Sequence, residues 1–475
     1  MKNNRPIALS ASTTLAALPA ESPISRLPEI AANITGSNRT VVVLDDDPTG
    51  TQTVADIPVL TEWSIESLCV TLNQQHPAFY ILTNSRSMSE AAAIRLTLEI
   101  GRNVLLASQQ TGRAVAVISR SDSTLRGHYP AETDALIEVL GQHDGCLLIP
   151  YFLEGGRLTI DDVHYVLEGD TLIPAGETPF AKDGTFGYRA SNLRDWVVEK
   201  SRGRISAESI TSISLTTIRQ GGVERVFEQL QQVADGQVVI VNAVTMCDLE
   251  IFTLGLLQAE AAGKRFIYRT AASFVPVRAG LAPRPLLTAA TLGLAATGGG
   301  LIVAGSYVPK TTQQIEALLA QTEIVSVVVQ VAVLLDDEAR SAEIARVVTA
   351  TDAALGANQD VIVYTSRALV TDHMGRSGLE IGRIISDSLV QIVQSLTQTP
   401  RYLVAKGGIT SSDIATDALK LRRASIAGQI LPGVPVWQCD AESLFPTLPY
   451  VIFPGNVGNS DALAQLVQQL ATPSY

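Results

Sequence analysis

The segment 41–54 constrains the fold most strongly, because a buried-strand pattern runs directly into a cluster of acids. It reads VVVLDDDPTGTQTV, in which four apolar residues precede Asp45, Asp46 and Asp47. Such a strand, followed by an acidic loop with a glycine, is typical of the carboxyl edge of a parallel sheet, where α/β enzymes bind ligands. Three adjacent carboxylates repel one another unless a cation, an arginine or a bound hydroxyl compensates. The segment therefore favours a site, and a solvated turn with a helix-capping aspartate is the simpler alternative.

The composition indicates a globular protein with two domains. The chain has 475 residues, of which 46% are hydrophobic and 17% charged, which is enough for two substantial cores. The net charge of −12 implies no large basic surface, so we expect no nucleic-acid partner. The four cysteines lie far apart without a CxxC pair, which argues against a zinc site or a disulfide framework and fits a reducing, cytoplasmic compartment.

No segment resembles a membrane anchor. The longest strongly apolar stretch, residues 324–335, is shorter than the roughly 20 residues that span a bilayer. Its valines and isoleucines predict a buried strand instead, and we expect no membrane partner. The N-terminal segment has Lys2 and Arg5 before a mildly apolar run, which resembles a signal peptide and leaves secretion as the alternative, but serines and threonines interrupt the continuous apolar run that a signal peptide needs. Residues 1–36 are therefore expected to form a flexible leader and a short helix.

Predicted strands alternate with predicted helices along the chain. The strands are 41–44, 78–82, 114–118, 146–149, 238–241 and 266–268, and helical patterns include 88–108 and 131–140. This alternation predicts an α/β fold of two domains, each a mainly parallel sheet flanked by helices, with a ligand cleft between them. Prolines and glycines gather in residues 276–300, where we expect the linker. The first domain would then cover residues 37–275 and the second residues 301–475.

The second half contains three strands that each end in a glycine loop before a helix. The loop residues are Gly305 and Ser306; Lys406, Gly407, Gly408 and Thr410; and Gly455, Asn456 and Gly458. Glycines allow backbone N–H groups to approach phosphate oxygens, and a helix N-terminus adds favourable partial charge. None of the loops has the GxxxxGK[ST] pattern. Together they favour a nucleotide site, whereas each one alone could serve only to turn the chain.

The first half carries polar residues after three predicted strands. Besides the aspartates, Thr83-Asn84-Ser85-Arg86 follows residues 78–82, and Arg120-Ser121-Asp122-Ser123-Thr124-Leu125-Arg126-Gly127 follows residues 114–118. Paired donors and acceptors suit a hydroxyl-rich ligand, and a guanidinium suits a ligand carboxylate. Arg86 and Arg126 could bind that carboxylate or form salt bridges to the nearby aspartates.

These residues resemble the four-carbon acid sugar kinase family. The shared motifs are the acidic DDxTG loop from Asp46 to Gly50, the DSTLRG segment from Asp122 to Gly127, and the late GGxT and GxxG loops at Gly407 and Gly455. Two further segments resemble those of the family, one containing Gly155, Gly156 and Arg157 and the other Thr178-Pro179-Phe180. The resemblance covers nearly the whole chain from about residue 40.

The resemblance implies an N-terminal acid-sugar-binding domain and a C-terminal ATP-binding domain. ATP would phosphorylate the terminal hydroxyl of a short sugar acid, four-carbon or a related branched or oxo acid. The last family loop usually reads KSGxFG, whereas Phe453 and Pro454 occupy the Lys and Ser places here. Lys406 beside another glycine loop could replace the missing cation. The partners implied are the sugar acid and ATP, and a homodimer is left open.

Phosphoryl transfer depends mainly on positioning and charge neutralisation. We expect Asp46, Asp47 and Asp122 to be catalytic, one accepting the hydroxyl proton and another placing Mg²⁺, with Asp47 as the metal ligand. The expected substrate-binding residues are Thr49, Asn84, Arg86, Ser123 and Arg126. The nucleotide would lie on the glycine-loop residues named above.

Two other functions compete with this hypothesis. VVVLDDDPT also fits the hhhhDxDxT pattern of haloacid-dehalogenase-like phosphatases, with Asp45 as nucleophile and Asp47 as acid/base. No convincing later lysine and acidic pair accompany it, and it leaves the glycine loops unexplained. A non-catalytic sugar-acid or nucleotide sensor is the third reading, because binding loops alone do not establish turnover.

Overall fold

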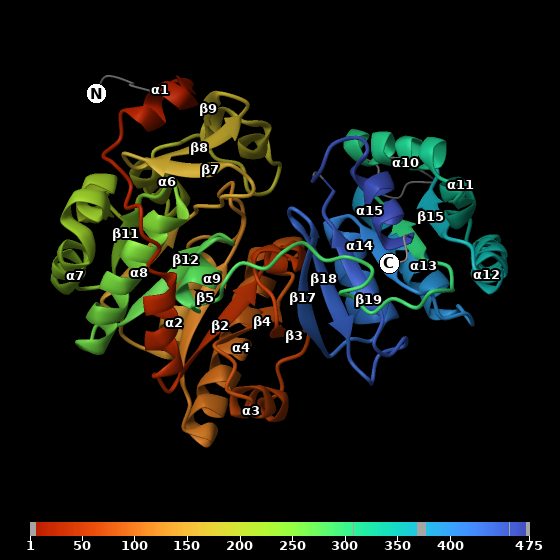
Figure 1. Ribbon diagram of the computed structural model, residues 1–475, viewed down its shortest axis with the longest axis horizontal. Coiled ribbons are helices and arrows are strands. Elements are labelled where there is room, and N and C mark those ends of the chain that lie inside the picture. Colours follow the sequence, from red (N-terminus) through yellow and green to blue (C-terminus); the bar gives the residue numbers. More distant parts are fainter. Residues whose placement is uncertain (1–5, 307, 368–376, 456, 472–475) are drawn as a thin grey trace. The chain divides into compact units, whose positions relative to one another are not determined.

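The computed structural model describes residues 6–306, 308–367, 377–455 and 457–471 (Figure 1). The chain packs as two compact units, the first of Met1–Thr53 and Glu62–Pro283, and the second of Val54–Thr61 and Arg284–Tyr475. The chain passes from the first unit to the second between Pro283 and Arg284. This boundary lies inside the segment 276–300, where the sequence predicts the linker. The short segment Val54–Thr61 belongs to the second unit, although its position in the sequence assigns it to the first domain.

The first unit is built on a parallel sheet in the order β10-β11-β6-β12-β5-β2-β4. Every adjacent pair in this order is parallel. The strands are almost fully buried, as their continuous runs of valine, isoleucine and leucine require for a sheet covered on both faces. Their bounds are β2 Arg39–Asp45, β4 Ala78–Leu82, β5 Ala114–Arg120, β6 Gly145–Ile149, β10 Thr211–Ile213, β11 Gln237–Val241 and β12 Phe266–Thr270.

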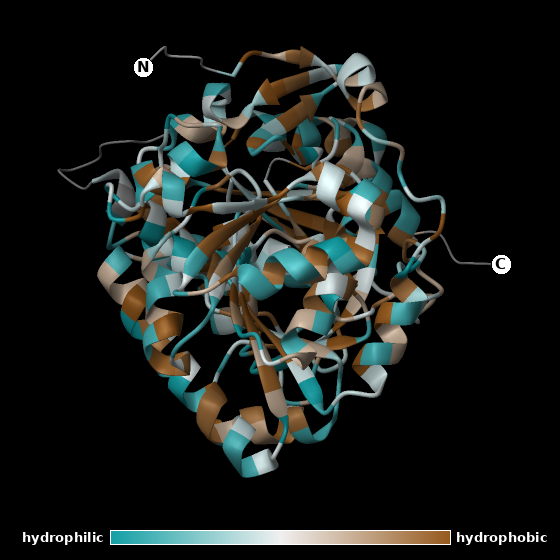
Figure 2. Cartoon of the chain, turned by 90° about the vertical axis from the view of Figure 1, so that its left-hand side faces the viewer, coloured by the Kyte–Doolittle hydropathy of each residue, from teal (hydrophilic) through white to brown (hydrophobic). Residues whose placement is uncertain are grey.

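Helices flank this sheet, with strands of mainly hydrophobic colour inside and hydrophilic helix faces outside (Figure 2). Local signals set their ends: the Ser89 hydroxyl caps α4 and Gly112 ends it with a left-handed conformation. A capping box of Thr245 and Asp248 starts α8. The helices are α1 Ala11–Ala16, α2 Leu27–Thr35, α3 Ile65–Asn73, α4 Glu90–Thr111, α5 Ala131–Leu140, α6 Leu193–Lys200, α7 Gly222–Gln232, α8 Met246–Ala261 and α9 Phe274–Arg278.

The first unit also carries a small antiparallel sheet in the order β1-β9-β8-β7. Its strands are β1 Leu9–Ser10, β7 Arg157–Ile160, β8 Val163–Glu168 and β9 Thr171–Pro174. Because β1 pairs with β9 and α2 packs against α8, residues 9–10 and 27–35 are integral parts of this unit. The expected flexible leader therefore differs from the structure over these residues, since apolar side chains such as Ile30 are buried there.

The second unit has a mixed sheet. Strands β19, β16, β13, β15 and β14 are joined by parallel pairs, and the antiparallel strands β3, β17 and β18 continue the sheet beyond β19. The bounds are β3 Ile57–Leu60, β13 Leu301–Ala304, β14 Val325–Val329, β15 Val361–Thr365, β16 Leu403–Lys406, β17 Arg423–Leu431, β18 Val434–Cys439 and β19 Pro449–Phe453.

Helices pack against the second sheet around a core that includes Ile302, Val404 and Val451. They are α10 Pro309–Gln321, α11 Val331–Leu334, α12 Arg340–Gly356, α13 Gly378–Gln394, α14 Gly408–Asp413 and α15 Ala462–Ala471. The apolar run 324–335 is not one strand: it forms β14 and then α11. In so short an apolar run, the periodicity of the apolar residues does not distinguish a strand from a helix. The strand ends before Gln330, which is the N-cap residue of α11.

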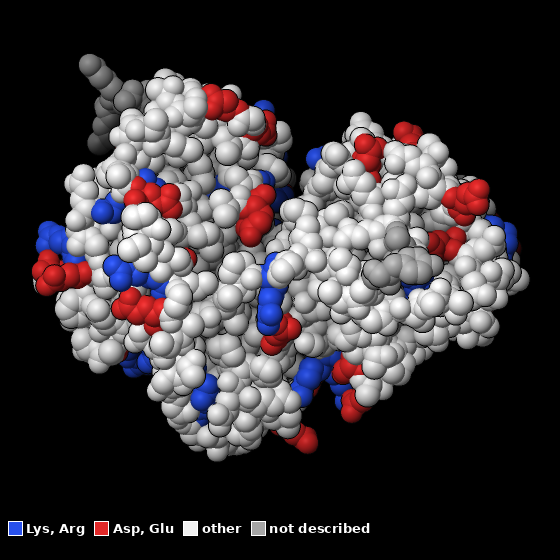
Figure 3. Space-filling view, in the orientation of Figure 1, with Lys and Arg blue, Asp and Glu red and all other residues white. Residues whose placement is uncertain are grey.

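The mixed α/β architecture, with mainly parallel sheets flanked by helices, confirms the predicted fold class. The sequence did not reveal the antiparallel strands β3, β7–β9, β17 and β18. Among the helices that the structure describes, none is both long and apolar enough to cross a membrane. On the face drawn in Figure 3, basic and acidic side chains of the described residues are interspersed in small groups.

Candidate active site

Three strands of the first unit end side by side, and a polar loop follows each one. Asp45 at the end of β2 is in register with Leu82 of β4 and Arg120 of β5. The 3-10 helices Pro48–Thr53 and Ser85–Ser87 follow β2 and β4. Because the strands are parallel, the loops start at one edge of the sheet, the place at which α/β proteins bind ligands.

Arg86 connects the acids of two of these loops. Its Nη2 lies 2.5 Å from Oδ2 of Asp47, and its Nη1 lies 3.1 Å from Oδ1 of Asp122. Its Nη2 also lies 3.8 Å from Oδ1 of Asp46. The three aspartates that the sequence singles out are therefore brought together around one guanidinium, whose charge compensates their repulsion.

Asp47 and Asp122 are held in their charged forms. Burial raises the pKa of Asp47, but Arg86 and hydrogen bonds from the Thr49 hydroxyl and backbone N–H bring it below the ordinary value. Burial opposes the charge of Asp122 too, and Arg86, Arg126 and the Thr124 hydroxyl lower its pKa further than burial raises it. The two side chains are 20% and 12% exposed, so both carboxylates remain within reach of a ligand.

Asp46 is more deeply buried than its two neighbours. Its side chain is 3% exposed, and its Oδ2 accepts a hydrogen bond from the Ser121 hydroxyl. Its Oδ1 lies 3.8 Å from the nearest Nη atoms of Arg86 and Arg120 and has no hydrogen-bond partner among the described residues. This burial suits a residue that orients the loop more than one that contacts a ligand directly.

Asp45 and Arg120 form a buried ion pair beneath the first loop. Arg120 Nη1 donates to Asp45 Oδ1 at 2.9 Å. Burial raises the pKa of Asp45 to about 7 against the opposing effect of Arg120. Gly50 crosses directly over this pair, since a Cβ atom at residue 50 would lie 2.2 Å from both Asp45 carboxylate oxygens. The glycine of the DDxTG motif is thus required by a close backbone approach.

Arg126 pairs with an acid from its own loop. Its Nε lies 2.8 Å from Asp122 Oδ2, its Nη2 lies 3.1 Å from Asp122 Oδ1, and its Nη1 lies 3.7 Å from Asp183 Oδ2. The salt bridge left open by the sequence is therefore present for both Arg86 and Arg126. Neither guanidinium is free of a carboxylate in the described structure, and each would have to share its charge with a bound ligand.

The remaining substrate-binding candidates differ in their surroundings. Thr49 contacts Asp47 through its hydroxyl and its N–H. Asn84 is half-buried at the end of β4 with a left-handed backbone, φ 50°. Ser123 is buried, and its carbonyl accepts a 2.8 Å hydrogen bond from His164 Nε2. Burial lowers the pKa of His164 to about 4, which keeps the ring neutral as it fixes this loop.

A buried network that sequence reasoning missed supports the DSTLRG segment. Arg269 Nη1 lies 3.2 Å from Glu132 Oε2, and Glu132 Oε1 accepts a 2.5 Å hydrogen bond from the Ser85 hydroxyl. Arg269 also donates to the Arg126 carbonyl at 3.4 Å. No local motif marks Glu132 or Arg269. Arg120 could have been predicted as a site residue, because it directly follows the apolar strand pattern that also precedes Asp122.

In the second unit, the three glycine loops meet at one edge of the sheet. Ala304, Lys406 and Phe453 end their strands in register. A Cβ atom on Gly305 would lie 2.7 Å from the Thr410 hydroxyl, and one on Gly407 would lie 3.2 Å from Ser306 Cβ. The loops thus lie close to one another, and Gly408 begins helix α14.

The end of the third loop is tied to α10. The Gln314 side-chain amide donates to the carbonyls of Val457 and Asn459 at 2.9 and 2.8 Å. Gly455 and Gly458 flank Asn456, which lies outside the described residues. Together the loops offer backbone N–H groups and a helix start, the features of a phosphate cradle.

Lys406 lies buried between these loops. Its Nζ donates to the Pro454 carbonyl at 2.7 Å and lies 4.0 Å from the centroid of the Phe453 ring. Burial, and then the nearby charge of Lys310, lower the pKa of Lys406 to about 7. Phe453, which occupies the place of the usual family lysine, supports a lysine from the neighbouring strand. A lysine is therefore present at this sheet edge, and its ammonium loses its proton as the pH rises through about 7.

The candidate metal ligand of the first unit is Asp47. Among the described residues, no three His, Cys, Asp or Glu side chains gather as a ready-made metal site. Mg²⁺ in phosphoryl-transfer enzymes typically uses one or two carboxylates together with substrate phosphates. Asp47 offers such a carboxylate, but its oxygens are engaged by Thr49 and Arg86.

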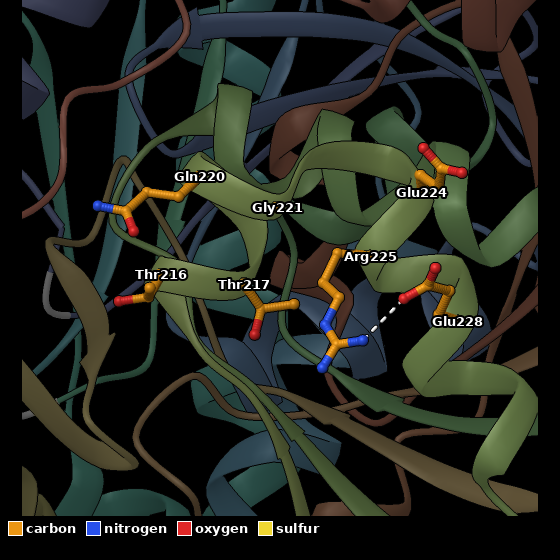
Figure 4. Close-up of a pocket in the computed structure, with 7 residues that line it drawn as sticks. All are labelled: Thr216, Thr217, Gln220, Gly221, Glu224, Arg225 and Glu228. Atoms are coloured by element: carbon orange, nitrogen blue, oxygen red, sulfur yellow. Dashed lines mark hydrogen bonds and ion pairs between the residues drawn. The ribbon is translucent and has the colours of Figure 1, made fainter.

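A surface hollow lies elsewhere in the first unit, on the π-helical turn Thr217–Gly221 and the start of α7 (Figure 4). Its rim includes the ion pair of Arg225 Nη1 and Glu228 Oε2 at 2.7 Å. The lining residues are Thr216, Thr217, Gln220, Gly221, Glu224, Arg225 and Glu228. None of these belongs to the acidic cluster, and the hollow has no buried charge of its own.

Family models and known relatives match both halves of the chain. A model described as a sugar-binding N-terminal domain matches residues 41–278, and one described as a nucleotide-binding C-terminal domain matches residues 301–463. D-erythronate kinase of Heliobacterium modesticaldum is 27% identical over 461 residues, covering 93% of this chain and 96% of the relative. 3-oxo-tetronate kinase of Pseudomonas fluorescens is 27% identical over 374 residues, covering 74% and 78%.

Crystal structures with the same fold come from two other bacteria. A Salmonella typhimurium protein has a TM-score of 0.67 at 18% identity, covering 91% of this chain and 99% of its own. A Haemophilus influenzae protein has a TM-score of 0.62 at 18% identity, covering 91% and 100%. At this identity the likeness concerns the fold alone.

Proposed function

The chain belongs to the four-carbon acid sugar kinase family, and from this membership we propose that it transfers the γ-phosphoryl group of ATP to the terminal hydroxyl of a short sugar acid. It is a sugar acid kinase, and the phosphatase and sensor hypotheses find no support in its relatives. The phosphatase reading also lacks an accessible nucleophile, because Asp45 is 1% exposed and paired with Arg120 beneath Gly50.

One observation carries the proposal: each unit has its own polar site at the carboxyl ends of parallel strands. The first unit gathers Asp47 and Asp122 around Arg86, which suits the hydroxyl groups of a sugar acid. The second surrounds Lys406 with glycine loops, which suits phosphates. Two sites of complementary chemistry on one chain are what a two-substrate phosphotransferase needs.

In the proposed mechanism, Asp47 and Asp122 hold the acceptor hydroxyl, and one of them receives its proton. Their charged forms are maintained by Arg86, so an unprotonated acceptor is available at neutral pH. Asp46 orients the loop through the Ser121 hydroxyl. Thr49, Asn84, Ser123 and Arg126 complete the proposed acid-binding surface.

On the nucleotide side, Lys406 donates to a phosphate oxygen, together with N–H groups of the glycine loops. The proposed residues are Gly305, Ser306, Gly407, Gly408, Thr410, Gly455 and Gly458. Among the described residues the Lys406 ammonium contacts two carbonyl oxygens and the Phe453 ring, none of which carries a full charge, whereas a phosphate offers full negative charge. Bound Mg²⁺ would neutralise charge on the phosphates, and Asp47 is the proposed protein ligand for it.

The proposal is tested by incubating the protein with Mg²⁺-ATP and a panel of short sugar acids. The panel contains D-erythronate, threonate, 3-oxo-tetronate and five-carbon aldonates, and both ADP and free phosphate are measured. We expect ADP release that depends on one acid and is not accompanied by free phosphate. A reaction without acid measures background ATP hydrolysis.

Two results would overturn the kinase. Release of phosphate from sugar phosphates in the absence of ATP would establish the phosphatase, and tight acid binding without any product would establish the sensor. A homodimer, a cytoplasmic location and a ligand cleft between the domains stay predictions, the first of which light scattering of the purified chain would test.

A further inference from the structure

Two sequence segments that have no role in the proposed mechanism meet in the first unit. Arg157 begins β7, and Phe180 lies in the 3-10 helix Pro179–Lys182. The Arg157 guanidinium lies 5.4 Å from the centroid of the Phe180 ring, and the Arg126 guanidinium lies 5.3 Å from the same centroid. One aromatic ring therefore supports two arginines, one of which belongs to the acidic cluster.

The two arginines differ in their acidic partners. Arg126 is paired with Asp122 and Asp183. Arg157 makes no ion pair among the described residues, and its Nη1 donates only to the carbonyl of Gly155. Its Nε is buried and has no hydrogen-bond partner in the described part of the chain. Burial lowers the pKa of Arg157, and Asp122 offsets this effect only in part.

The backbone holds Arg157 in place. Phe152 and Arg157 exchange two backbone hydrogen bonds, 3.0 and 2.8 Å long, across a tight turn. A Cβ atom on Gly155 would lie 2.4 Å from the Phe152 ring and 2.9 Å from Arg157 Nη1, so the turn needs a glycine there. A guanidinium on such a rigid turn loses little freedom when it binds a ligand.

Each arginine of the cluster already faces a protein carboxylate. The carboxylates of Asp45, Asp46, Asp47 and Asp122 face the guanidiniums of Arg86, Arg120 and Arg126. Because the three arginines of this set are already engaged by protein carboxylates, none of them offers its full charge to an anionic substrate. A carboxylate ligand needs a guanidinium that is not already neutralised.

We propose that Arg157, supported by the Phe180 ring, binds the carboxylate of the sugar acid and so determines the selectivity of the site for acids over neutral polyols. This inference rests on the proposed kinase function. Arg157 reaches the ligand with its planar fork while Asp47 and Asp122 hold the hydroxyl at the other end. The segments around Gly155 and Phe180 then have one shared purpose, which is to present this arginine.

The test compares an acid with its primary amide, which has the same shape without the charge. The probes are the panel acid with the highest kcat/KM, D-erythronate being tried first, and the corresponding carboxamide. The variants are Arg157→Met, Arg157→Lys and, as a matched control, Arg189→Met. Arg189 is 91% exposed on the same unit, so its replacement removes the same charge away from the cluster.

We expect Arg157→Met to lower kcat/KM for the acid about 10- to 100-fold, mainly through KM, as the loss of a charge-assisted hydrogen-bonded pair predicts. The value for the amide should stay nearly unchanged, so the acid-to-amide ratio falls toward one. Arg157→Lys should lie between Arg157→Met and the wild type because it keeps the charge and loses the fork. Arg189→Met should behave as the wild type.

An unchanged acid-to-amide ratio in a folded Arg157→Met, or an equal loss for acid and amide, would overturn the assignment. Calorimetric binding of the acid without ATP gives a second readout. A wild type that binds the acid without phosphorylating it would refute the kinase while still testing Arg157 through affinity. A wild type that binds none of the acids would overturn both proposals.

Discussion

Replacement of Lys406 by methionine should stabilise the second unit at neutral pH while weakening nucleotide binding. Lys406 is fully buried, with carbonyl oxygens of Pro454 and Gly455 and the Phe453 ring around its ammonium. No carboxylate among the described residues forms an ion pair with it. Burial, and then Lys310, lower the pKa of Lys406 from 10.5 to about 7.

The size of the effect follows from this pKa. At 1.36 kcal/mol per pKa unit, the shift makes the charged side chain unfavourable in the folded protein by about 5 kcal/mol. Methionine removes that term, but it also removes a hydrogen bond and a cation–π contact worth about 1 kcal/mol each. The free energy of unfolding at pH 7 should therefore rise by about 3 kcal/mol in Lys406→Met.

The gain must depend on pH in a definite direction. Between pH 7 and 10.5 the unfolded chain holds this proton more tightly than the folded protein, so the stability of the wild type rises with pH across that window. The penalty is complete below about pH 7 and disappears toward pH 10.5. By pH 10 the advantage of Lys406→Met should have vanished, because only the lost contacts remain.

The assay is urea-induced unfolding of the full chain at pH 7 and pH 10, followed by the fluorescence of buried Trp437 in a background with Trp63→Phe and Trp196→Phe. Lys420→Met, on an exposed residue of the same unit, is the matched control. Calorimetry should show Mg²⁺-ATP binding weakened about 10- to 100-fold in Lys406→Met alone. Equal stability of variant and wild type at pH 7, or a gain that persists at pH 10, would refute the reasoning.

Three further predictions concern the first unit. Asp47→Asn and Asp122→Asn should each lower kcat about 10²- to 10⁴-fold while ATP affinity measured by calorimetry changes little; normal turnover in both would remove them from the mechanism. Gly50→Ala should lower the thermal midpoint and the activity, because its Cβ would lie 2.2 Å from the Asp45 carboxylate, whereas Gly184→Ala, with no atom within 4 Å, should resemble the wild type. Burial raises the pKa of Asp45 from an ordinary 3.8 to about 7, so between pH 4 and 7 the folded protein binds a proton on Asp45 that the unfolded chain has lost, and the free energy of unfolding falls as the pH rises. Asp45→Asn should flatten this pH dependence in urea titrations. An unchanged slope in the variant would contradict the prediction.

Much of the fold was predictable because its signals are local. The predicted strand 78–82 coincides with β4, and the predicted helix 131–140 coincides with α5. Apolar runs bounded by polar loops mark buried parallel strands wherever they occur in a chain. The run 324–335 shows the limit, since its valines serve both β14 and α11.

Pairing between distant segments was not predictable. The segment Val54–Thr61 lies within the predicted first domain in the sequence. Its strand β3 nevertheless pairs with β17 of the second unit, which follows more than 360 residues later in the chain. Whether Arg86 serves a ligand or a protein carboxylate was left open for the same reason. Its contacts with Asp47 and Asp122 depend on the register of three strands, which no local pattern encodes.

The sequence by itself determined the fold class, the polar loops at strand ends and the family motifs that point to an acid and a nucleotide. These depend on residue type, periodicity and order, which are properties of short segments. Only the tertiary structure decided which charges neutralise one another: that Lys406 lies over Phe453, that Arg126 is taken by Asp122, and that Arg157 keeps its charge unpaired among the described residues. Charge interactions act across space over a few ångströms, so their outcome is fixed by packing and not by neighbours along the chain.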